Sequence, residues 1–438
     1  MSLPRYPKYK DSKCDWFRTV PMHWDVSRLK LSVSLVTEKT DRRSNPIALE
    51  NIEGWSGKFV PTETEFAGDG VAFEPGDILF GKLRPYLAKA YLADSAGEAV
   101  GDFHVLRPTR TLVPRFLQYL VLSQEFIAMV DGSTFGSKMP RVSWEFLANM
   151  LLAVPPRDEQ SAIVAFLDRE TGKIDTLIAE QEKLLVLLAE KRQATVSHAV
   201  TRGLSPDALM KDSGVAWLGD VPAHWEVKQL RYIAKIVRGA SPRPAGDPLF
   251  FAPDNNDGSN TPWVTVAEVT KDTATHLESV SEFLTPLGAE SSQYFERGTL
   301  IFTNSGATLG VPKILAIDCC ANDGILAFKN LSPSVDSLFL YFFLLTTTDR
   351  LRTEMKQGGG QPNLNTDIVK SIFFAKPSTE EQSAIAAFLQ LESARLDSLK
   401  AEAERAIDLL KERRSALIAA AVTGKIDVRN TVPQELAA

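Results

Sequence analysis

The sequence has few cysteines and no long apolar run. Three of its 438 residues are cysteine (Cys14, Cys319 and Cys320), and none lies in the CxxC spacing of zinc sites. A disulfide scaffold is therefore excluded, and a reducing cytoplasm is the expected compartment. No stretch approaches the roughly 18 apolar residues of a membrane-spanning helix, and the N-terminus has no apolar signal core, so we expect neither a membrane protein nor a secreted one.

The sequence also lacks an overall excess of basic residues. Its net charge is −6, which by itself argues against a nucleic-acid-binding protein. Basic residues are nevertheless concentrated locally. Residues 1–43 hold ten Lys or Arg against five Asp or Glu, and residues 225–243 hold five against one. These two stretches are either basic patches for a polyanion or ordinary solvated surface.

Recognisable catalytic motifs are absent as well. The sequence contains no GxGxxG after an expected strand, no GxxxxGK(S/T) phosphate loop and no Asn-Pro-Pro-aromatic tetrapeptide. The glycine run at residues 358–360 is followed by neither a helix start nor a Lys-Ser/Thr pair. The sequence thus predicts no catalytic residue, no metal site and no cofactor bound to this chain.

The sequence does contain two repeated stretches that interleave. Ten of the twenty residues 10–29 recur 201 positions later, where chance gives about one match in fifteen. Eight of the nine residues 159–167 recur 222 positions later. The order of entry motif, body and helix is therefore used twice. Such a pseudo-two-fold chain suits a target that also has two halves.

The entry motif ends in a repeated His-Trp pair, His23-Trp24 and His224-Trp225. A functional interpretation would make the two histidines a paired site. We expect instead that each pair is a packed structural element of its own entry motif.

One long helix is predicted in each half, over residues 158–200 with a potential break at Gly172, and over residues 380–422. Ser378 and Glu381 form a capping-box signature at the start of the second helix. Apolar residues recur at spacings of three and four, which favours either a coiled coil between the two helices or packing of each helix on its own body. The candidate seam and partner-docking residues are Phe166, Ile174, Leu177, Leu184, Leu188, Phe388, Leu396, Leu399, Leu410 and Leu417.

The two bodies, residues 44–155 and 243–375, are rich in Gly, Pro and β-forming residues, which predicts an α+β fold. Residues 76–81 and 298–302 are predicted buried strands that follow tight turns, with residues 99–106 and 325–328 as their strand partners. Short helices are predicted over residues 114–130 and 335–356. The two bodies share little sequence beyond these predicted strands and helices. They are therefore expected to recognise two different targets, while the repeated entry motifs and long helices form a common scaffold.

Polar and basic loops follow the predicted strands. Arg and Lys can pair with guanine edges, Asn and Gln with adenine edges, and Ser or Thr with either, although ordinary turns have the same composition. The candidate DNA-binding residues are Lys82, Arg84, Lys89, Ser137, Lys138, Arg141, Arg238, Arg243, Asn304, Ser305, Thr308, Lys313, Gln361 and Asn363.

Several of these stretches resemble the specificity subunit of type I restriction–modification enzymes. Residues 211–225, KDSGVAWLGDVPAHW, are close to the family's entry motif. Residues 76–89 and 304–310 resemble two types of recognition domain, and residues 156–163 and 377–385 resemble the starts of the two spacer helices. The first entry motif departs from this pattern at residues 13–15 and 17–18, which concerns local packing of the N-terminal segment.

The resemblance implies a tandem duplication in which two target-recognition domains are joined by two long antiparallel helices. The predicted divisions are residues 1–155 (N-terminal segment and first recognition domain), 156–203 (first spacer helix), 204–375 (second recognition domain), 376–427 (second spacer helix) and 428–438 (C-terminal tail). Each domain would read one half of a bipartite, asymmetric double-stranded DNA site. The helices would set the gap between the halves and dock two methyltransferase subunits.

The resemblance also implies which chemistry lies on partners in a prokaryotic cytoplasm. Methyltransferase subunits would bring S-adenosylmethionine and methylate adenine, and motor-nuclease subunits would bring ATP and Mg²⁺. A motor-less, type IIB-like system is the alternative. Two more distant alternatives are an enzyme with an unrecognised active site and a structural adaptor that does not contact DNA.

A helix over residues 172–200 is about 42 Å long. This length is enough to hold two recognition domains about 34–36 Å apart, which is one turn of DNA.

Overall fold

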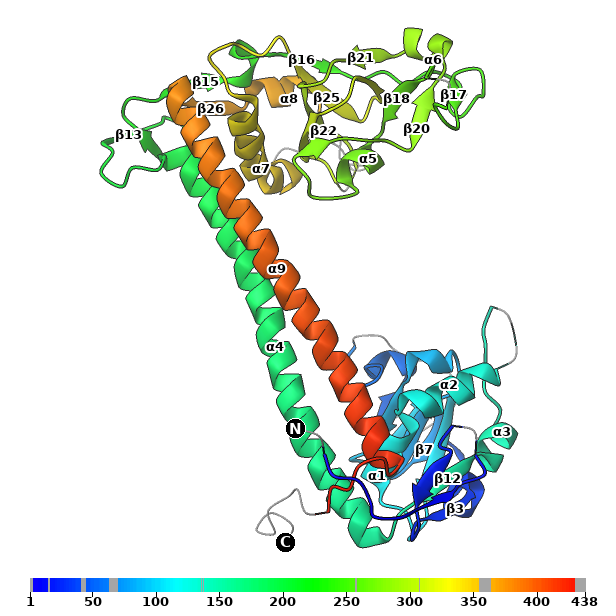
Figure 1. Ribbon diagram of the computed structural model, residues 1–438. Coiled ribbons are helices and arrows are strands. Elements are labelled where there is room, and N and C mark those ends of the chain that lie inside the picture. Colours follow the sequence, from blue (N-terminus) through cyan, green and yellow to red (C-terminus); the bar gives the residue numbers. More distant parts are fainter. Residues whose placement is uncertain are drawn as a thin grey trace. The chain divides into compact units, whose positions relative to one another are not determined.

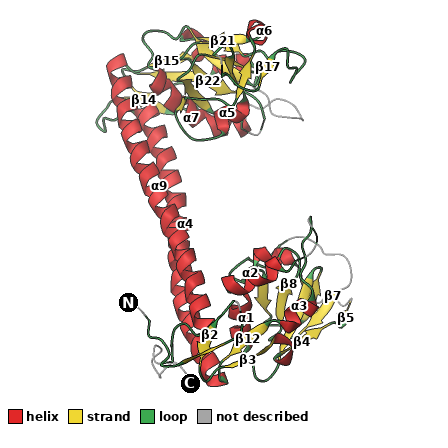
Figure 2. Ribbon diagram, turned by 45° about the vertical axis from the view of Figure 1, so that its right-hand side comes forward, coloured by secondary structure: helices red, strands yellow, loops and turns green. Residues whose placement is uncertain are grey.

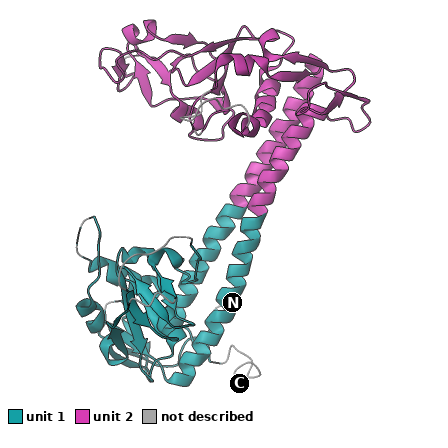
Figure 3. Cartoon of the chain, turned by 180° about the vertical axis from the view of Figure 1, so that it is seen from behind, with its two compact units in different colours: residues 1–183, 403–438 teal, residues 184–402 magenta. Residues whose placement is uncertain are grey.

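The structure is a computed structural model that describes residues 3–14, 16–40, 45–62, 70–134, 136, 138–256, 258–306, 308–353 and 364–429. The chain forms two compact units (Figure 3). Unit 1 contains residues 1–183 and 403–438, and unit 2 contains residues 184–402. Each unit holds one globular α+β domain and a stretch of both long helices, so the predicted α+β class is confirmed.

The globular part of unit 1 contains two four-stranded sheets, with strand orders β4-β11-β8-β9 and β5-β7-β10-β6 (Figure 2). Strand β8 is buried at every residue and pairs antiparallel with β11 and β9, as its apolar Ile-Leu-Phe run predicts. The strands of these sheets are β4 (Val33–Val36), β5 (Lys39–Thr40), β6 (Pro46–Ile47), β7 (Gly70–Phe73), β8 (Ile78–Gly81), β9 (Ala90–Leu92), β10 (Gly97–Val100) and β11 (Phe103–Pro108).

The first entry motif forms two small strand pairs beside these sheets. Strands β1 (Tyr9–Asp11) and β2 (Thr19–Pro21) pair with each other, and β3 (Asp25–Arg28) pairs with β12 (Leu151–Val154), which directly precedes the first long helix. The shorter helices of unit 1 are η1 (Leu29–Leu31), η2 (Leu49–Asn51), η3 (Pro85–Leu87), α1 (Pro114–Val121), α2 (Gln124–Gly132) and α3 (Trp144–Asn149).

Unit 2 repeats this plan with larger sheets, of strand orders β16-β25-β22-β23-β19 and β17-β20-β18-β24-β21. Strand β22 is buried throughout, as predicted, and pairs with β25. The second entry motif again forms a hairpin, β13-β14, and a strand pair, β15-β26.

The elements of unit 2 are β13 (Met210–Asp212), β14 (Asp220–Pro222), β15 (Glu226–Gln229), η4 (Leu230–Tyr232), β16 (Lys235–Arg238), β17 (Phe251–Ala252), β18 (Thr261–Val264), α5 (Val266–Thr270), β19 (His276–Leu277), β20 (Glu282–Leu284), α6 (Pro286–Glu290), β21 (Gln293–Phe295), β22 (Leu300–Thr303), β23 (Pro312–Leu315), β24 (Cys319–Ala321), β25 (Ile325–Lys329), α7 (Ser337–Thr353), α8 (Thr366–Ser371) and β26 (Phe373–Lys376).

The two long helices, α4 (Arg157–Arg202) and α9 (Thr379–Val422), lie side by side and antiparallel within each unit (Figures 1 and 3). In unit 1 Arg414 Nε donates to Asp175 Oδ1 at 3.0 Å, and in unit 2 Arg192 Nη1 donates to Asp397 Oδ1 at 2.5 Å. The coiled-coil interpretation is confirmed. Each helix also packs on its own globular body at its start. Ile163, Phe166 and Leu167 of α4 and Ile385, Ala386 and Leu389 of α9 pack into the domain cores.

The structure corrects the predicted helix seam. On α4 the buried and half-buried positions follow a heptad pattern through Thr171, Ile174, Ile178, Gln181, Leu185, Leu188, Arg192, Thr195 and Ala199. Ile174, Leu188 and Leu396 lie in the seam, and Leu410 and Leu417 are half-buried there. Leu177, Leu184 and Leu399 were expected in the seam but are exposed, because they occupy the heptad position that flanks it. Phe388 is also exposed.

Two local predictions differ from the structure, at Gly172 and over residues 99–106. Helix α4 runs unbroken through Gly172, because its backbone hydrogen bonds need no side chain there. The strand expected over 99–106 is divided between β10 and β11 in different sheets, whereas the short helices expected over 114–130 are present as α1 and α2. Ser378 Oγ accepts from the backbone N–H of Glu381 at 3.3 Å, which is one of the two hydrogen bonds of a capping box, and the Glu381 side chain binds His224.

Of the helices that the structure describes, none combines the length and apolar composition needed to cross a lipid bilayer.

Candidate nucleic-acid interface

Each entry motif is attached to the start of a long helix through one glutamate. In unit 1 Glu159 is bound by His23 Nε2 at 2.7 Å, Trp24 Nε1 at 3.0 Å and Tyr6 Oη at 2.5 Å. In unit 2 His224 Nε2 binds Glu381 at 2.9 Å. Trp24 and Trp225 are both buried, as a packed His-Trp motif predicts, whereas the side chains of His23 and His224 are 41% and 60% exposed and each binds the glutamate of its own unit.

The two junctions differ because the residues around them differ. Asp207 stands 201 positions after Tyr6, and a second carboxylate has no hydroxyl to donate to Glu381. The indole N–H of Trp225 has no hydrogen-bond partner, whereas that of Trp24 binds Glu159. Burial, followed by the hydrogen bond to Glu159, raises the pKa of the Tyr6 phenol well above its ordinary value.

The glutamine that follows each glutamate attaches the body to the same helix. The Gln160 side chain accepts from the backbone N–H of Val113 at 2.7 Å and donates to the carbonyls of Thr111 and Pro155, both at 2.9 Å. Gln382 makes the same three kinds of bond, to Asp336, Ser334 and Pro377. Both glutamines are completely buried, so this repeated pair forms the structural joint between recognition domain and helix.

In the first domain, two predicted DNA-binding residues meet at one aspartate, which we call the Asp102 cluster. Arg141 donates from Nε and Nη2 to the two carboxylate oxygens of Asp102, at 3.2 and 2.8 Å, and Lys82 Nζ lies 3.6 Å from Oδ1. The hydrogen bonds from Arg141 hold the pKa of Asp102 below its ordinary range. The carboxylate thereby orients two half-exposed basic side chains at one end of β8 and β11.

Arg84 lies beside this cluster in a strained turn. Arg84 and Ala88 both have left-handed backbone conformations, with φ of 49° and 48°, and flank the single turn of η3. Arg84 N–H donates to the Pro140 carbonyl at 2.8 Å, which fixes the turn against the segment that carries Arg141. The Arg84 side chain is exposed, and Tyr86 in the same turn is also exposed.

The second domain contains a corresponding group around Asp323, the Asp323 cluster. Arg238 Nε donates to the Asp323 carbonyl at 2.5 Å, Arg243 Nη2 lies 3.6 Å from its carboxylate, and Ser241 Oγ donates to that carboxylate at 2.8 Å. Asp323 lies in the turn before β25, and Asp102 lies in the turn before β11. In each domain, two of the predicted basic residues therefore lie near the start of the corresponding strand, β11 or β25, although the residues themselves differ.

The remaining candidate DNA-binding residues lie outside these two clusters. Lys138 and Thr308 are exposed and Ser305 is half-buried. Lys89 donates to the Leu49 carbonyl at 2.6 Å, which gives its ammonium a structural partner. Ser137, Gln361 and Asn363 lie outside the described residues.

Two candidates are not where a DNA duplex could contact them. Lys313 and Asn304 are each only 1% exposed. The Lys313 ammonium is paired with Asp272, because a buried charge requires a counter-charge. Asn304 is fixed by backbone hydrogen bonds from its N–H to Gly324 and from Leu364 to its carbonyl, while its side-chain oxygen has no hydrogen-bond partner among the described residues.

The sequence interpretation missed the ion pairs between the long helices. Asp175 and Asp397 are 222 positions apart, and so are Arg192 and Arg414. The second repeat therefore continues beyond residue 167, and extending its alignment would have found these four residues. In each pair the aspartate of one repeat binds the arginine of the other. Among the described residues, no three His, Cys, Asp or Glu side chains are grouped as a metal site requires.

A duplicated helical frame that carries two different α+β domains, each with its own basic cluster, is the architecture of a recognition subunit with two readers. Residues 222–405 match the family model described as the type I restriction modification DNA specificity domain. The chain is 22% identical over 437 residues to the type I restriction enzyme MjaVIII specificity subunit of Methanocaldococcus jannaschii, covering 94% of this chain and 95% of that protein. It is 21% identical over 337 residues to the EcoKI specificity subunit of Escherichia coli K12, covering 74% and 68%.

Solved structures show the same fold. A chain from a study of complex assembly and conformational transition of the type I R-M system superposes with a TM-score of 0.70 at 20% identity, covering 92% of this chain and 98% of that one. The HsdS subunit from Thermoanaerobacter tengcongensis gives a TM-score of 0.53 at 19% identity, with coverage of 94% and 98%. Residues 222–405 thus match the specificity-domain family model, and the chain is similar over nearly its whole length to type I restriction–modification specificity subunits, as the sequence motifs indicated. The motor-less alternative is not favoured, because the named relatives are type I subunits.

Proposed function

We propose that this chain is the non-catalytic DNA-recognition subunit of a type I restriction–modification enzyme, and that its two domains read the two halves of a bipartite, asymmetric site. The proposal rests on two basic clusters, around Asp102 and Asp323, that contain different residues. They lie in the turns before the corresponding strands β11 and β25. Phosphate contacts position a protein on DNA and base contacts specify the sequence. A symmetric frame with unlike readers suits a site that is not a palindrome.

We further propose that the exposed apolar residues of the helices dock two methyltransferase subunits. Leu177 and Leu399 are related by the 222-residue repeat and are 45% and 39% exposed, and Leu187 and Leu409 are related in the same way and are also exposed. Contiguous patches of exposed apolar side chains, rimmed by polar residues, are typical of partner surfaces. Since they occur twice in equivalent places, they suit two equal partners.

The partners would supply the chemistry. Methyltransferase subunits would bind S-adenosylmethionine, and motor-nuclease subunits would bind ATP and Mg²⁺, in a prokaryotic cytoplasm. The direct test is to express this chain with its methyltransferase subunits and to locate methylated adenines by single-molecule sequencing. We expect one two-part motif with an unspecified gap. Methylation by the isolated chain, or methylated adenines without a common motif, would overturn the proposal.

Binding of the assembled complex to its DNA site is expected to weaken steeply with salt. This chain has a net charge of −6, so its own contribution to affinity depends on local basic side chains that displace counterions from phosphates. If about five of them contact phosphates, the slope of log affinity against log salt is about −4 to −5. Fluorescence anisotropy with a labelled duplex measures this slope, and a flat salt dependence would contradict the proposed interface.

Lengthening both helices is expected to change the gap and not the bases read. One heptad inserted into α4 and one into α9 preserves the seam pattern and adds about 10 Å to each helix. At about 3.4 Å per base pair, this corresponds to a gap longer by roughly three base pairs. Sequencing of methylated adenines gives both the half-sites and the gap. A variant that read different bases at an unchanged gap would refute the spacing role.

A further inference from the structure

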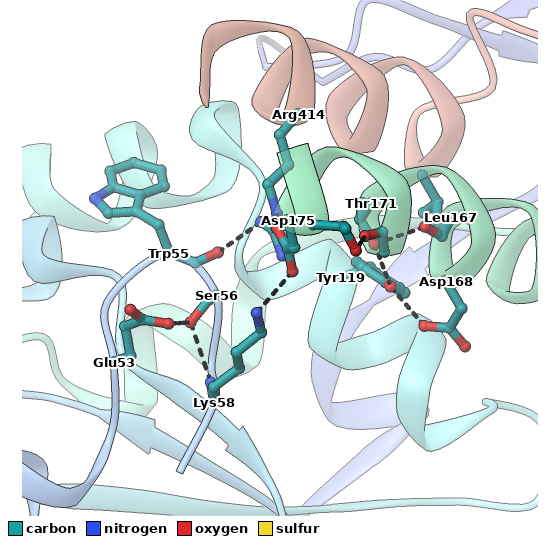
Figure 4. Close-up of polar contacts among 12 residues, drawn as sticks. Glu53, Trp55, Ser56, Lys58, Tyr119, Leu167, Asp168, Thr171, Asp175 and Arg414 are labelled. Atoms are coloured by element: carbon teal, nitrogen blue, oxygen red, sulfur yellow. Dashed lines mark hydrogen bonds and ion pairs between the residues drawn. The ribbon is translucent and has the colours of Figure 1, made fainter. Parts of the chain in front are cut away.

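A loop of the first recognition domain is bonded to both long helices at once (Figure 4). Lys58 Nζ lies 2.8 Å from Asp175 Oδ2 on α4. Arg414 on α9 donates from Nε to Asp175 Oδ1 at 3.0 Å and from Nη1 to the Trp55 carbonyl at 3.1 Å. We call Trp55, Lys58, Asp175 and Arg414 the brace. It forms a closed ring of contacts between the loop, α4 and α9.

The loop that carries the brace is itself firmly shaped. Glu53 N–H donates to the Lys58 carbonyl at 2.9 Å, and Gly57 N–H donates to the Glu53 carbonyl at 3.0 Å. Gly57 has a φ of 67°, and a Cβ there would lie 2.2 Å from the Ala90 carbonyl oxygen, so only glycine fits. A displacement of the helices at Asp175 or Arg414 therefore moves the whole loop and not one side chain.

The same loop also contacts the turn that presents Arg84. Trp55 N–H donates to the Ala88 carbonyl at 2.8 Å. Gly54 packs so closely on this turn that a Cβ would lie 2.4 Å from the Leu87 carbonyl oxygen. Trp55 thus connects the two structures, with its N–H on the Arg84 turn and its carbonyl on Arg414 of α9.

Polar contacts link the loop to both helices. A cleft of about 710 Å³ lies between the loop, the start of α1 and α4, and Lys58, Asp175 and Arg414 line it. The side chains of Arg414 and Asp175 are only 14% and 23% exposed, so their hydrogen bonds are weakly screened by water. The orientation of the loop consequently depends on these few charged groups.

The second unit has the helix ion pair without the loop. Asp397 and Arg192 are the repeat equivalents of Asp175 and Arg414, and they bond to each other at 2.5 Å. In the part of the chain that the structure describes, Arg192 and Asp397 form no hydrogen bond to the second recognition domain. Their charges do act on the buried Tyr341 of α7, whose pKa is raised mainly by burial. The brace is therefore an addition to the duplicated frame, and Arg192 provides a matched control.

We propose that Lys58, Asp175 and Arg414 are positioning residues that hold the Arg84 turn at a fixed place relative to the helices, and so set the gap at which the first half-site is accepted. The inference rests on the proposed function in DNA recognition. It predicts that weakening the brace makes the complex tolerant of gap length while the bases of both half-sites are still read.

The experiment uses the full chain assembled with its methyltransferase subunits. Initial methylation rates are measured on duplexes with the cognate gap and with gaps one base pair longer or shorter. Lys58→Met and Arg414→Gln are each expected to reduce the preference for the cognate gap about tenfold, in the range of energetic coupling between linked sites. Arg192→Gln removes an equivalent helix ion pair and is expected to leave the preference unchanged. Lys58→Arg, which keeps the ion pair to Asp175, is expected to retain it.

The outcomes separate the inference from the function on which it rests. Equal loss of gap preference in Arg414→Gln and Arg192→Gln would show that only helix-pair stability matters, and an unchanged preference in both Lys58→Met and Arg414→Gln would show that the brace does not position the domain. Either result overturns the inference. If Arg414→Gln fails to assemble, Lys58→Met alone decides, because Lys58 is an exposed side chain. Absence of any site preference in the unmodified complex would instead refute the proposed function.

Discussion

Replacing Arg84 with alanine is expected to reduce discrimination at one half-site about 10- to 100-fold and to leave the other half-site unaffected. An arginine that donates two hydrogen bonds to a guanine edge contributes about 1–3 kcal/mol of discrimination against other bases. The structure supports this role for Arg84, because its side chain is exposed at the end of a turn whose backbone is fixed by Pro140 and Trp55. Alanine also carries a Cβ, so the strain of the left-handed conformation is little changed.

The measurement is competitive methylation of duplexes that differ by single bases in each half-site. Arg243→Ala in the Asp323 cluster is expected to give the complementary result, with loss at the other half-site only. Arg110 provides the control within the first domain. It is exposed, but it lies beyond the opposite end of β11 from Asp102, so Arg110→Ala should leave both half-sites unchanged. Equal loss at both half-sites in Arg84→Ala would indicate damage to the scaffold and contradict base reading.

Replacing Gln160 with leucine is expected to destabilise unit 1 by about 3–5 kcal/mol. The leucine would leave the buried carbonyl of Pro155 without a partner and would remove the partly buried hydrogen bonds to the Val113 N–H and the Thr111 carbonyl. Each unsatisfied buried group costs about 1–3 kcal/mol, and the apolar side chain offsets part of the sum. For a unit of this size the unfolding temperature should fall by about 10 °C.

Differential scanning calorimetry tests this expectation. Gln193→Leu is the control, because Gln193 lies on the same helix but is exposed, and its replacement should change stability by no more than about 0.5 kcal/mol. The equivalent change Gln382→Leu should affect unit 2 in the same way as Gln160→Leu affects unit 1. If Gln160→Leu and Gln193→Leu unfolded at the same temperature, the joint would not depend on the buried glutamine.

The difference between the two glutamate junctions illustrates how one repeat acquires two environments. Glu159 and Glu381 begin a stretch of nine residues with eight identities, yet Glu159 has three partners and is almost fully buried, whereas Glu381 hydrogen-bonds through its side chain to His224. The extra partners come from Tyr6 and Trp24, which the chain brings to α4 from more than a hundred residues away. Repetition in the sequence therefore predicts the joint but not its strength.

The candidate DNA-binding residues also show which properties the local sequence predicts and which it does not. Lys82 and Arg141 are far apart in sequence, and nothing in their local context predicts that they share Asp102. Lys313 has the composition of a surface lysine in a β-strand, but burial of β23 places its ammonium against Asp272. Local sequence gives the chemistry of a side chain, while its access to DNA depends on the strands that pack over it.

The sequence by itself determined the duplication, the α+β character of the two bodies, the two long helices and the resemblance to type I specificity subunits. These properties are carried by identities and periodicities between nearby or evenly repeated positions, and they survive without knowledge of any distant contact. The tertiary structure alone decided which apolar residues face the helix seam, which basic residues gather at Asp102 and Asp323, and that a loop of the first domain is bonded to both helices. Burial and charge pairing depend on residues that the fold brings together from distant parts of the chain, and such pairings leave no local pattern.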